Sequence, residues 1–91
     1  MKVKFQAILE VGAALMAVER NGNALRYVKE QTEAVCLKAV KQNGDALQYV
    51  KEQTEAVCLT AVKNDSYALQ YVKDKDLFIK IAEVLDIDIE F

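Results

Sequence analysis

The sequence predicts an all-α fold, namely a short α-solenoid of about four 22-residue helix-turn-helix repeats with degenerate caps. Two observations lead to this fold class. One unit recurs along the chain, and within each unit the apolar residues follow helical spacing between residues typical of helix ends. A single unit cannot bury such wide apolar faces, so successive units must stack. The chain has no proline and its valines do not alternate with polar residues, which gives an all-β fold little support.

The repeat is clearest in the middle of the chain. Residues 24–45 align without gaps on residues 46–67, with 16 of 22 positions identical, and the run from Tyr27 to Leu37 matches over eleven consecutive residues. The first and last copies diverge, as terminal repeats with one neighbour do. We expect a single helical-repeat domain over 1–91, made of an N-terminal cap repeat (1–23), two repeats (24–45 and 46–67), and a C-terminal cap repeat with an acidic tail (68–91).

Each unit is expected to hold a longer and a shorter helix. Thr32 is a good N-cap for the longer one. The apolar face of this longer helix consists of Val35, Cys36, Ala39 and Val40, and Leu37 widens it. Leu37 aligns with Leu15 and Leu59, and we expect all three leucines to lie in the core. We expect Gly44 to end this helix in the left-handed conformation.

The shorter helix is expected to begin directly after Gly44. Asp45 would cap it, with Gln48 completing a capping box. Ser66 and Tyr67 replace Gly44 and Asp45 in the next unit, so we expect the turn before Ala68 to be built differently.

One motif of the repeat is Ala-Leu-Gln-Tyr-Val at 46–50, followed by Val57-Cys58-Leu59-x-Ala61-Val62-Lys63. This pattern resembles the tandem helical repeat family catalogued as domain of unknown function 4116, over about Leu15 to Val72. The resemblance implies the helical-repeat fold, occurrence in longer arrays and often in bacterial proteins. It implies no activity, because none is established for the repeat.

Composition narrows the function classes. Twelve basic and fourteen acidic residues give a net charge of -2, which supplies no general attraction to nucleic acid or to an anionic membrane. Lys and Glu interrupt every apolar stretch, so we expect no membrane span and a cytoplasmic protein. The chain has no histidine, no glycine-rich phosphate loop and no Gly-x-Ser-x-Gly motif. We therefore expect no enzyme activity and no cofactor.

The two cysteines, Cys36 and Cys58, stand 22 residues apart in the same slot of adjacent units. We expect both to be buried free thiols, since equivalent positions of packed helices lie too far apart for a disulfide. With no histidine and no third cysteine, the sequence predicts no metal site.

Polar residues that recur once per unit are the candidate binding residues. Arg26, Gln48 and Gln70 are expected on the solvent side of the short helices, which we prefer as the binding face because it is expected to be concave. A similar surface on the long helices comprises Lys38, Thr60, Lys41 and Lys63. A third set comprises Lys29, Lys51 and Lys73, but an acidic residue follows each one, so nucleic-acid binding is not expected.

One aromatic residue also recurs per unit, in the row Phe5, Tyr27, Tyr49 and Tyr71. Such a row fits interior packing with the hydroxyls reaching water, or alternatively a stacking platform for bases or a peptide.

The tail, residues 86–91, alternates acidic and apolar side chains. Its apolar residues, Ile87, Ile89 and Phe91, are expected to cover the last helices. Alternatively, its acidic residues, Asp86, Asp88 and Glu90, belong to a peptide that binds a partner.

The sequence therefore favours a non-catalytic protein-protein interaction module with an unidentified protein partner. One alternative is a small phage- or pathogen-encoded inhibitor that blocks its target, with the acidic C-terminal end as the blocking surface. The other is a structural fragment that self-associates weakly through its end caps.

Overall fold

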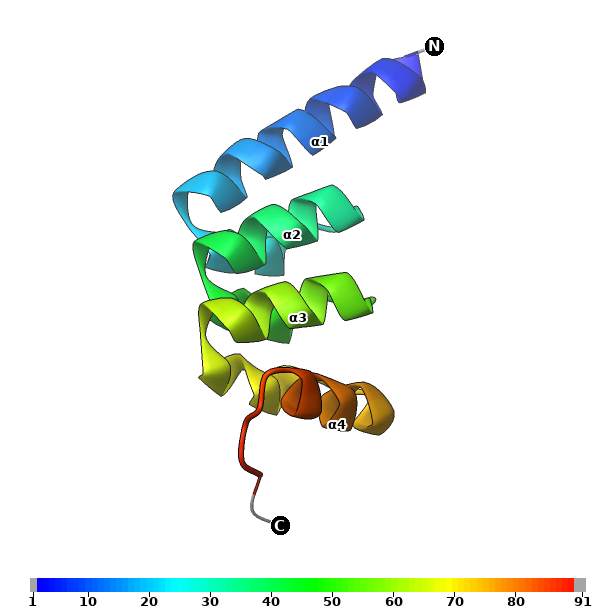
Figure 1. The fold of residues 1–91 in the computed structure, drawn as a ribbon. Helices are drawn as coiled ribbons and strands as arrows, with labels where there is room; N and C mark the ends of the chain where they lie inside the picture. Colours follow the sequence, from blue (N-terminus) through cyan, green and yellow to red (C-terminus); the bar gives the residue numbers. More distant parts are fainter. Residues whose placement is uncertain (1, 90–91) are drawn as a thin grey trace.

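A computed structural model describes residues 2–89 of the chain, and the side chains of residues 11–89. Four α-helices alternate with three six-residue 3-10 helices: α1 (Lys2–Arg20), η1 (Gly22–Tyr27), α2 (Glu33–Gln42), η2 (Gly44–Tyr49), α3 (Glu55–Asn64), η3 (Ser66–Tyr71) and α4 (Lys75–Val84). The α-helices lie side by side in one layer, and the 3-10 helices form a second layer behind them (Figure 1). The fold is elongated, with extents of 51 × 23 × 17 Å. The expected all-α helical-repeat fold is confirmed.

The long helices begin where the sequence predicts. The Thr32 hydroxyl accepts a hydrogen bond from the Val35 amide at 3.2 Å, and Thr54 repeats this bond with Val57. Asp74 caps α4 in the same manner. These side chains satisfy amide groups that the first turn of a helix leaves without intrahelical partners.

The N-caps of the short helices lie two residues earlier than expected. Asn43 has extended backbone angles, and its side chain accepts from the Asp45 amide at 3.0 Å. Asn43 therefore ends α2 and begins η2, so the prediction of Asp45 as the cap was wrong. Gln48 forms no capping box with Asp45, because its amide nitrogen donates instead to the Asp45 carbonyl at 3.1 Å.

Close packing, and not a left-handed backbone, explains the glycine at position 44. Its φ is not positive, which corrects the sequence prediction. A Cβ atom at Gly44 would lie 2.7 Å from the Ala61 carbonyl oxygen and 2.9 Å from the Asp65 Cβ. Gly22 meets the carbonyl of Ala39 in the same way. The glycine is required because the end of the next long helix packs directly on it.

The last short helix is built like the others, which also corrects an expectation. Asp65 takes the place of Asn43 and accepts from the Tyr67 amide at 3.0 Å, so η3 forms with the same cap. Ser66 stands where Gly22 and Gly44 are buried, but it is exposed. A side chain is tolerated there because its position is open to solvent.

The core confirms most of the predicted apolar stripe. Val35, Cys36, Ala39 and Val40 are buried, as are their counterparts Val57, Cys58, Ala61 and Val62. Leu37 is only half-buried, and so are Leu15 and Leu59, so these leucines pack at the edge of the core and not within it. The reason is angular: the buried stripe is centred between Cys36 and Ala39, and Leu37 lies ~130° around the helix from that centre.

The tail packs as the sequence predicts over the residues that the structure describes. Asp86 has a positive φ of 54°, which turns the chain after α4. The Ile87 amide then donates to the Ala82 carbonyl at 2.8 Å, and Ile87 and Ile89 pack against the core. Phe91 lies outside the described residues, and so does the side chain of Phe5 in α1.

Within residues 2–89, none of the helices combines the length and the apolar character that a bilayer crossing requires.

Two glycines test the packing account. Gly44→Ala should lower the free energy of unfolding by about 1–3 kcal/mol, because a backbone carbonyl must move. Gly12→Ala is the matched control in α1, where an added Cβ meets nothing within 4 Å and should raise stability by about 0.5–1 kcal/mol. Chemical denaturation measures both, and equal effects of the two substitutions would contradict the account.

Candidate interaction surface

Gln31, in the segment between η1 and α2, joins two repeats. Its Nε2 donates to the Tyr49 carbonyl at 2.8 Å and to the Leu25 carbonyl at 3.4 Å. Its Oε1 accepts from the Lys51 amide at 2.9 Å. One side chain therefore binds a carbonyl of η1, in its own repeat. In the next repeat it binds the carbonyl of the last residue of η2 and an amide just after that helix.

Gln53 makes the same bonds one repeat later. Its Nε2 donates to the carbonyls of Tyr71 at 2.8 Å and Leu47 at 3.3 Å, and its Oε1 accepts from the Lys73 amide at 2.9 Å. We call these two sets of bonds the glutamine bridges. Their near-identical distances mean that η2 is placed on η1 as η3 is placed on η2.

Amide side chains also join the repeats at the opposite end of the long helices. Gln42 accepts from the Gly22 amide at 2.7 Å and donates to the Arg20 carbonyl at 3.4 Å. Asn64 donates to the carbonyls of Val40 and Lys41 at 3.0 and 3.1 Å. These bonds satisfy carbonyls at the helix ends, which lack intrahelical partners. The contacts of α2 with α1 and with α3 are therefore fixed at this end as well as at the end that carries the glutamine bridges.

The three side chains preferred as binding residues, Arg26, Gln48 and Gln70, are all exposed. They occupy equivalent positions on η1, η2 and η3, which pack consecutively. We call this set the short-helix row. Gln48 and Gln70 also share one conformation, since each donates from Nε2 to the carbonyl three residues earlier at 3.1 Å. The row is thus a regular feature of the surface.

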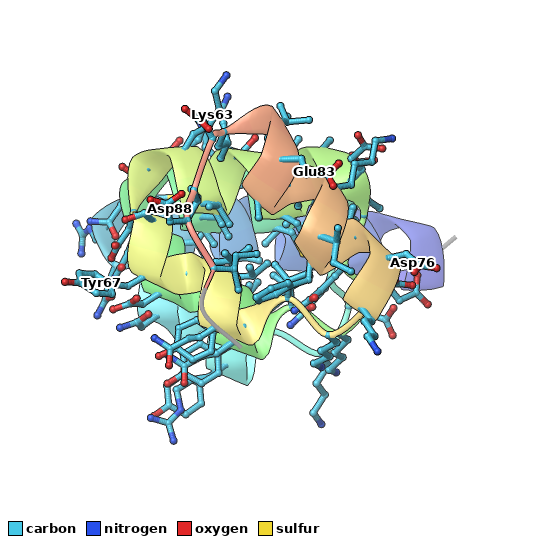
Figure 2. All side chains as sticks on the ribbon, turned by 60° about the horizontal axis from the view of Figure 1, so that its bottom comes forward. Lys63, Tyr67, Asp76, Glu83 and Asp88 are labelled. Atoms are coloured by element: carbon cyan, nitrogen blue, oxygen red, sulfur yellow. The ribbon has the colours of Figure 1, made fainter. Side chains whose placement is uncertain are left out.

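The tyrosines lie next to the short-helix row. Tyr49 and Tyr71 are half-buried and pack against the core, as interior packing predicts. Tyr27 is 76% exposed, so interior packing was the wrong expectation there. α1 runs without a break into the first turn, so no short helix precedes η1 to cover this ring. Figure 2 shows a further ring, that of Tyr67, which points away from the ribbon and is 78% exposed.

Lys29, Lys51 and Lys73 are exposed on the segments that follow the short helices. The Lys51 ammonium donates to the Lys29 carbonyl at 3.2 Å. An open groove of about 370 Å³ lies beside these segments. Its lining includes Lys29, Lys51, Glu30, Glu33 and Glu52. Because carboxylates outnumber the ammonium groups, this groove does not favour an anionic ligand.

The acidic candidates lie on the tail, at one end of the stack. Asp86 and Asp88 are exposed on the tail that follows α4, at the end of the stack opposite α1 (Figure 1). Figure 2 shows Asp88 on the tail beyond that helix. Glu90 lies outside the described residues.

Both cysteine thiols are buried and free, as predicted. Burial raises the pKa of Cys58 to about 11, and the nearby Asp74 carboxylate adds to the rise. Burial also raises the pKa of Cys36, with a smaller contribution from Glu33. A protonated, buried thiol is a poor nucleophile. Among the side chains that the structure describes, no three potential metal ligands of the His, Cys, Asp or Glu type gather at one place.

The model of one protein family matches the chain twice. Domain of unknown function (DUF4116) aligns with residues 14–55 and again with residues 32–78. The chain belongs to the DUF4116 family. Two overlapping matches are what a tandem repeat produces, and they cover the region in which the sequence resemblance lies. The DUF4116 chain matches no curated protein and no solved structure.

The glutamine bridges are not predicted from the sequence. Gln31 and Gln53 lie within the eleven-residue identical run, so their recurrence was visible. What the sequence did not show was that a polar residue between two helices bonds to the following repeat. The identity of a polar residue across copies, in a segment that is not a helix cap, was the available signal.

Removing a bridge should destabilise the DUF4116 fold. Gln53→Met keeps a long side chain but deprives the Tyr71 carbonyl and the Lys73 amide of their partner, so it should cost about 1–3 kcal/mol of unfolding free energy. The same change at Gln70, which is exposed, should stay within ~0.5 kcal/mol. Urea denaturation of both variants is the measurement, and a Gln53→Met loss no larger than that of Gln70→Met would disprove the role of the bridge.

Thiol reactivity tests the burial of the cysteines. A rise of the Cys58 pKa from 9.0 to about 11 reduces its thiolate fraction about 100-fold at mildly alkaline pH. Ellman's reagent should therefore label folded protein far more slowly than urea-unfolded protein. Cys36 lines the groove, so Cys58→Ala protein should react faster than Cys36→Ala protein. Equal rates in folded and unfolded protein would show that the thiols are accessible.

Proposed function

We propose that this DUF4116 chain is a non-catalytic protein-protein interaction module that binds a partner protein through its short-helix layer. The observation that carries the proposal is the short-helix row, in which Arg26, Gln48 and Gln70 are exposed at equivalent positions beside the tyrosines. Stacked repeats present such aligned side chains to extended partners. Arginine and tyrosine are also enriched among the residues that contribute most to protein interfaces.

Charge favours a protein over a nucleic acid as the partner. Phosphate binding depends on clustered basic side chains. Here Lys29, Lys51 and Lys73 are each followed by an acidic residue, and the net charge is -2. We further propose a bacterial, cytoplasmic setting. Bacterial occurrence is what the family resemblance implies, and two buried free thiols suit a reducing compartment.

The acidic tail supports a second candidate function, that of an inhibitor that blocks a basic target. Residues 73–91 hold three basic and six acidic side chains, against nine and eight in residues 1–72. Packing of Ile87 and Ile89 on the core leaves Asp86 and Asp88 exposed on a fixed segment. In this case, binding should weaken steeply with added salt.

The short-helix row is tested by replacing Arg26, Gln48 and Gln70 together with alanine. All three are exposed, so each change should alter stability by no more than about 0.5–1 kcal/mol, including the loss of Arg26 from the tyrosine rings. Capture of the protein partner from cell extract should weaken about tenfold or more. The matched control replaces Lys41 and Lys63, which are exposed on the long helices, with alanine and should leave capture unchanged. Unchanged capture by the triple variant would exclude the row and direct attention to Asp86 and Asp88.

A further inference from the structure

The surroundings of Arg26 show what the short-helix layer accommodates. The central carbon of its guanidinium lies 5.1 Å from the centre of the Tyr27 ring and 5.7 Å from that of Tyr49. Both distances lie within the ~6 Å range of cation-π attraction. One guanidinium therefore contacts the tyrosines of two successive repeats. We call the space shared by two successive tyrosines an inter-tyrosine slot.

The repeat creates a second inter-tyrosine slot between Tyr49 and Tyr71. The glutamine bridges hold the carbonyls of both tyrosines at the same 2.8 Å from the glutamine of the preceding repeat. The residues that follow the three tyrosines also have similar backbone angles, with φ -87° and ψ 114° at Val28, φ -76° and ψ 120° at Val50, and φ -73° and ψ 118° at Val72. The step from Tyr49 to Tyr71 therefore repeats the step from Tyr27 to Tyr49.

The second slot lacks the guanidinium that the first slot holds. Its repeat carries Gln48 at the position of Arg26, and the Gln48 amide nitrogen turns back to the Asp45 carbonyl at 3.1 Å. Among the described side chains, no cation lies over the Tyr71 ring. The nitrogen of Gln48 is engaged, whereas no described residue donates to its Oε1. The slot thus combines two half-exposed aromatic rings with one hydrogen-bond acceptor.

We propose that the slot between Tyr49 and Tyr71 binds an arginine side chain of the partner protein. This rests on the proposed function, since it names the chemistry that the short-helix layer recognises. A guanidinium is planar, stacks on aromatic rings, and has further N–H groups to donate to the Gln48 Oε1. The first slot already holds this group from within the chain. A cationic side chain also complements the net charge of -2.

A titration followed by nuclear magnetic resonance tests the slot without knowledge of the partner. The probe is N-acetyl-arginine amide, and its control is N-acetyl-citrulline amide, which has the same shape but no charge. The arginine probe should shift the resonances of Gln48, Tyr49 and Tyr71 in a saturable manner, and the citrulline probe should bind about tenfold more weakly or not at all. Equal responses to both probes, or no response at these residues, would overturn the proposal.

The two slots supply reciprocal variants. Gln48→Arg fills the second slot from within, as the preceding repeat does naturally, and should abolish the response to the arginine probe. Arg26→Gln empties the first slot and should add a second set of shifts at Tyr27 and Tyr49. A Gln48→Arg protein that binds as well as the native chain, or an Arg26→Gln protein without new shifts, would contradict the slot.

The two experiments distinguish a failure of the arginine slot from a failure of the proposed function. If the arginine probe does not bind while the triple alanine variant still loses its partner, the layer is a binding surface and the arginine chemistry is wrong. If the probe binds while the triple variant retains its partner, the slot exists but the proposed function is wrong.

Discussion

Two glutamine side chains, Gln31 and Gln53, connect the main chain of each repeat to that of the next. A six-residue 3-10 helix has few internal bonds and gains little stability alone. The segment that follows it leaves a carbonyl and an amide to be satisfied. A primary amide offers a donor and an acceptor on one group, so a single glutamine satisfies both. It also fixes the distance between repeats, and the regular spacing of the short-helix row follows from that distance.

Small residues allow successive repeats to lie close together. Where a short helix begins, the end of the next long helix lies so close that Gly22 and Gly44 have no room for a Cβ atom. The buried residues of α2 and α3 are valine, alanine and cysteine, and Leu37 lies at the edge of the core. The larger buried side chains, Leu25 and Leu47, come from the short helices. Close approach and polar bridging therefore act together, because hydrogen bonds of about 2.8 Å from Gln31 and Gln53 require this spacing.

The features predictable from sequence are those that depend on one repeat. Thr32 as a cap and the stripe from Val35 to Val40 follow from helix geometry alone, and the structure confirms them. The sequence does not reveal why residue 44 is glycine, because a helix end and a close contact both favour glycine and only the neighbouring repeat distinguishes them. The sequence favours Asp45 as the cap, because nothing in it indicates the extended backbone by which Asn43 both ends α2 and begins η2.

The candidate surface also has features that the sequence predicts and features that depend on the contact between repeats. Sequence placed Arg26, Gln48 and Gln70 at equivalent positions, because their spacing equals the repeat. It did not show that the Arg26 guanidinium reaches the Tyr49 ring in the next repeat, since that contact depends on how two repeats are stacked. The difference between Arg26 and Gln48, a simple substitution in the alignment, becomes a difference between an occupied and an open slot.

Amide hydrogen exchange at Lys51 and Lys73 tests the central role of the glutamine bridges most directly. Both residues are exposed and lie outside the helices, so their amides have no protection from secondary structure. Each donates to a bridging glutamine at 2.9 Å. The account predicts that both amides exchange far more slowly than unprotected peptide and that Gln31→Met and Gln53→Met each remove the protection at the matching lysine. Exchange of Lys51 and Lys73 at the unprotected rate in the native protein would contradict it.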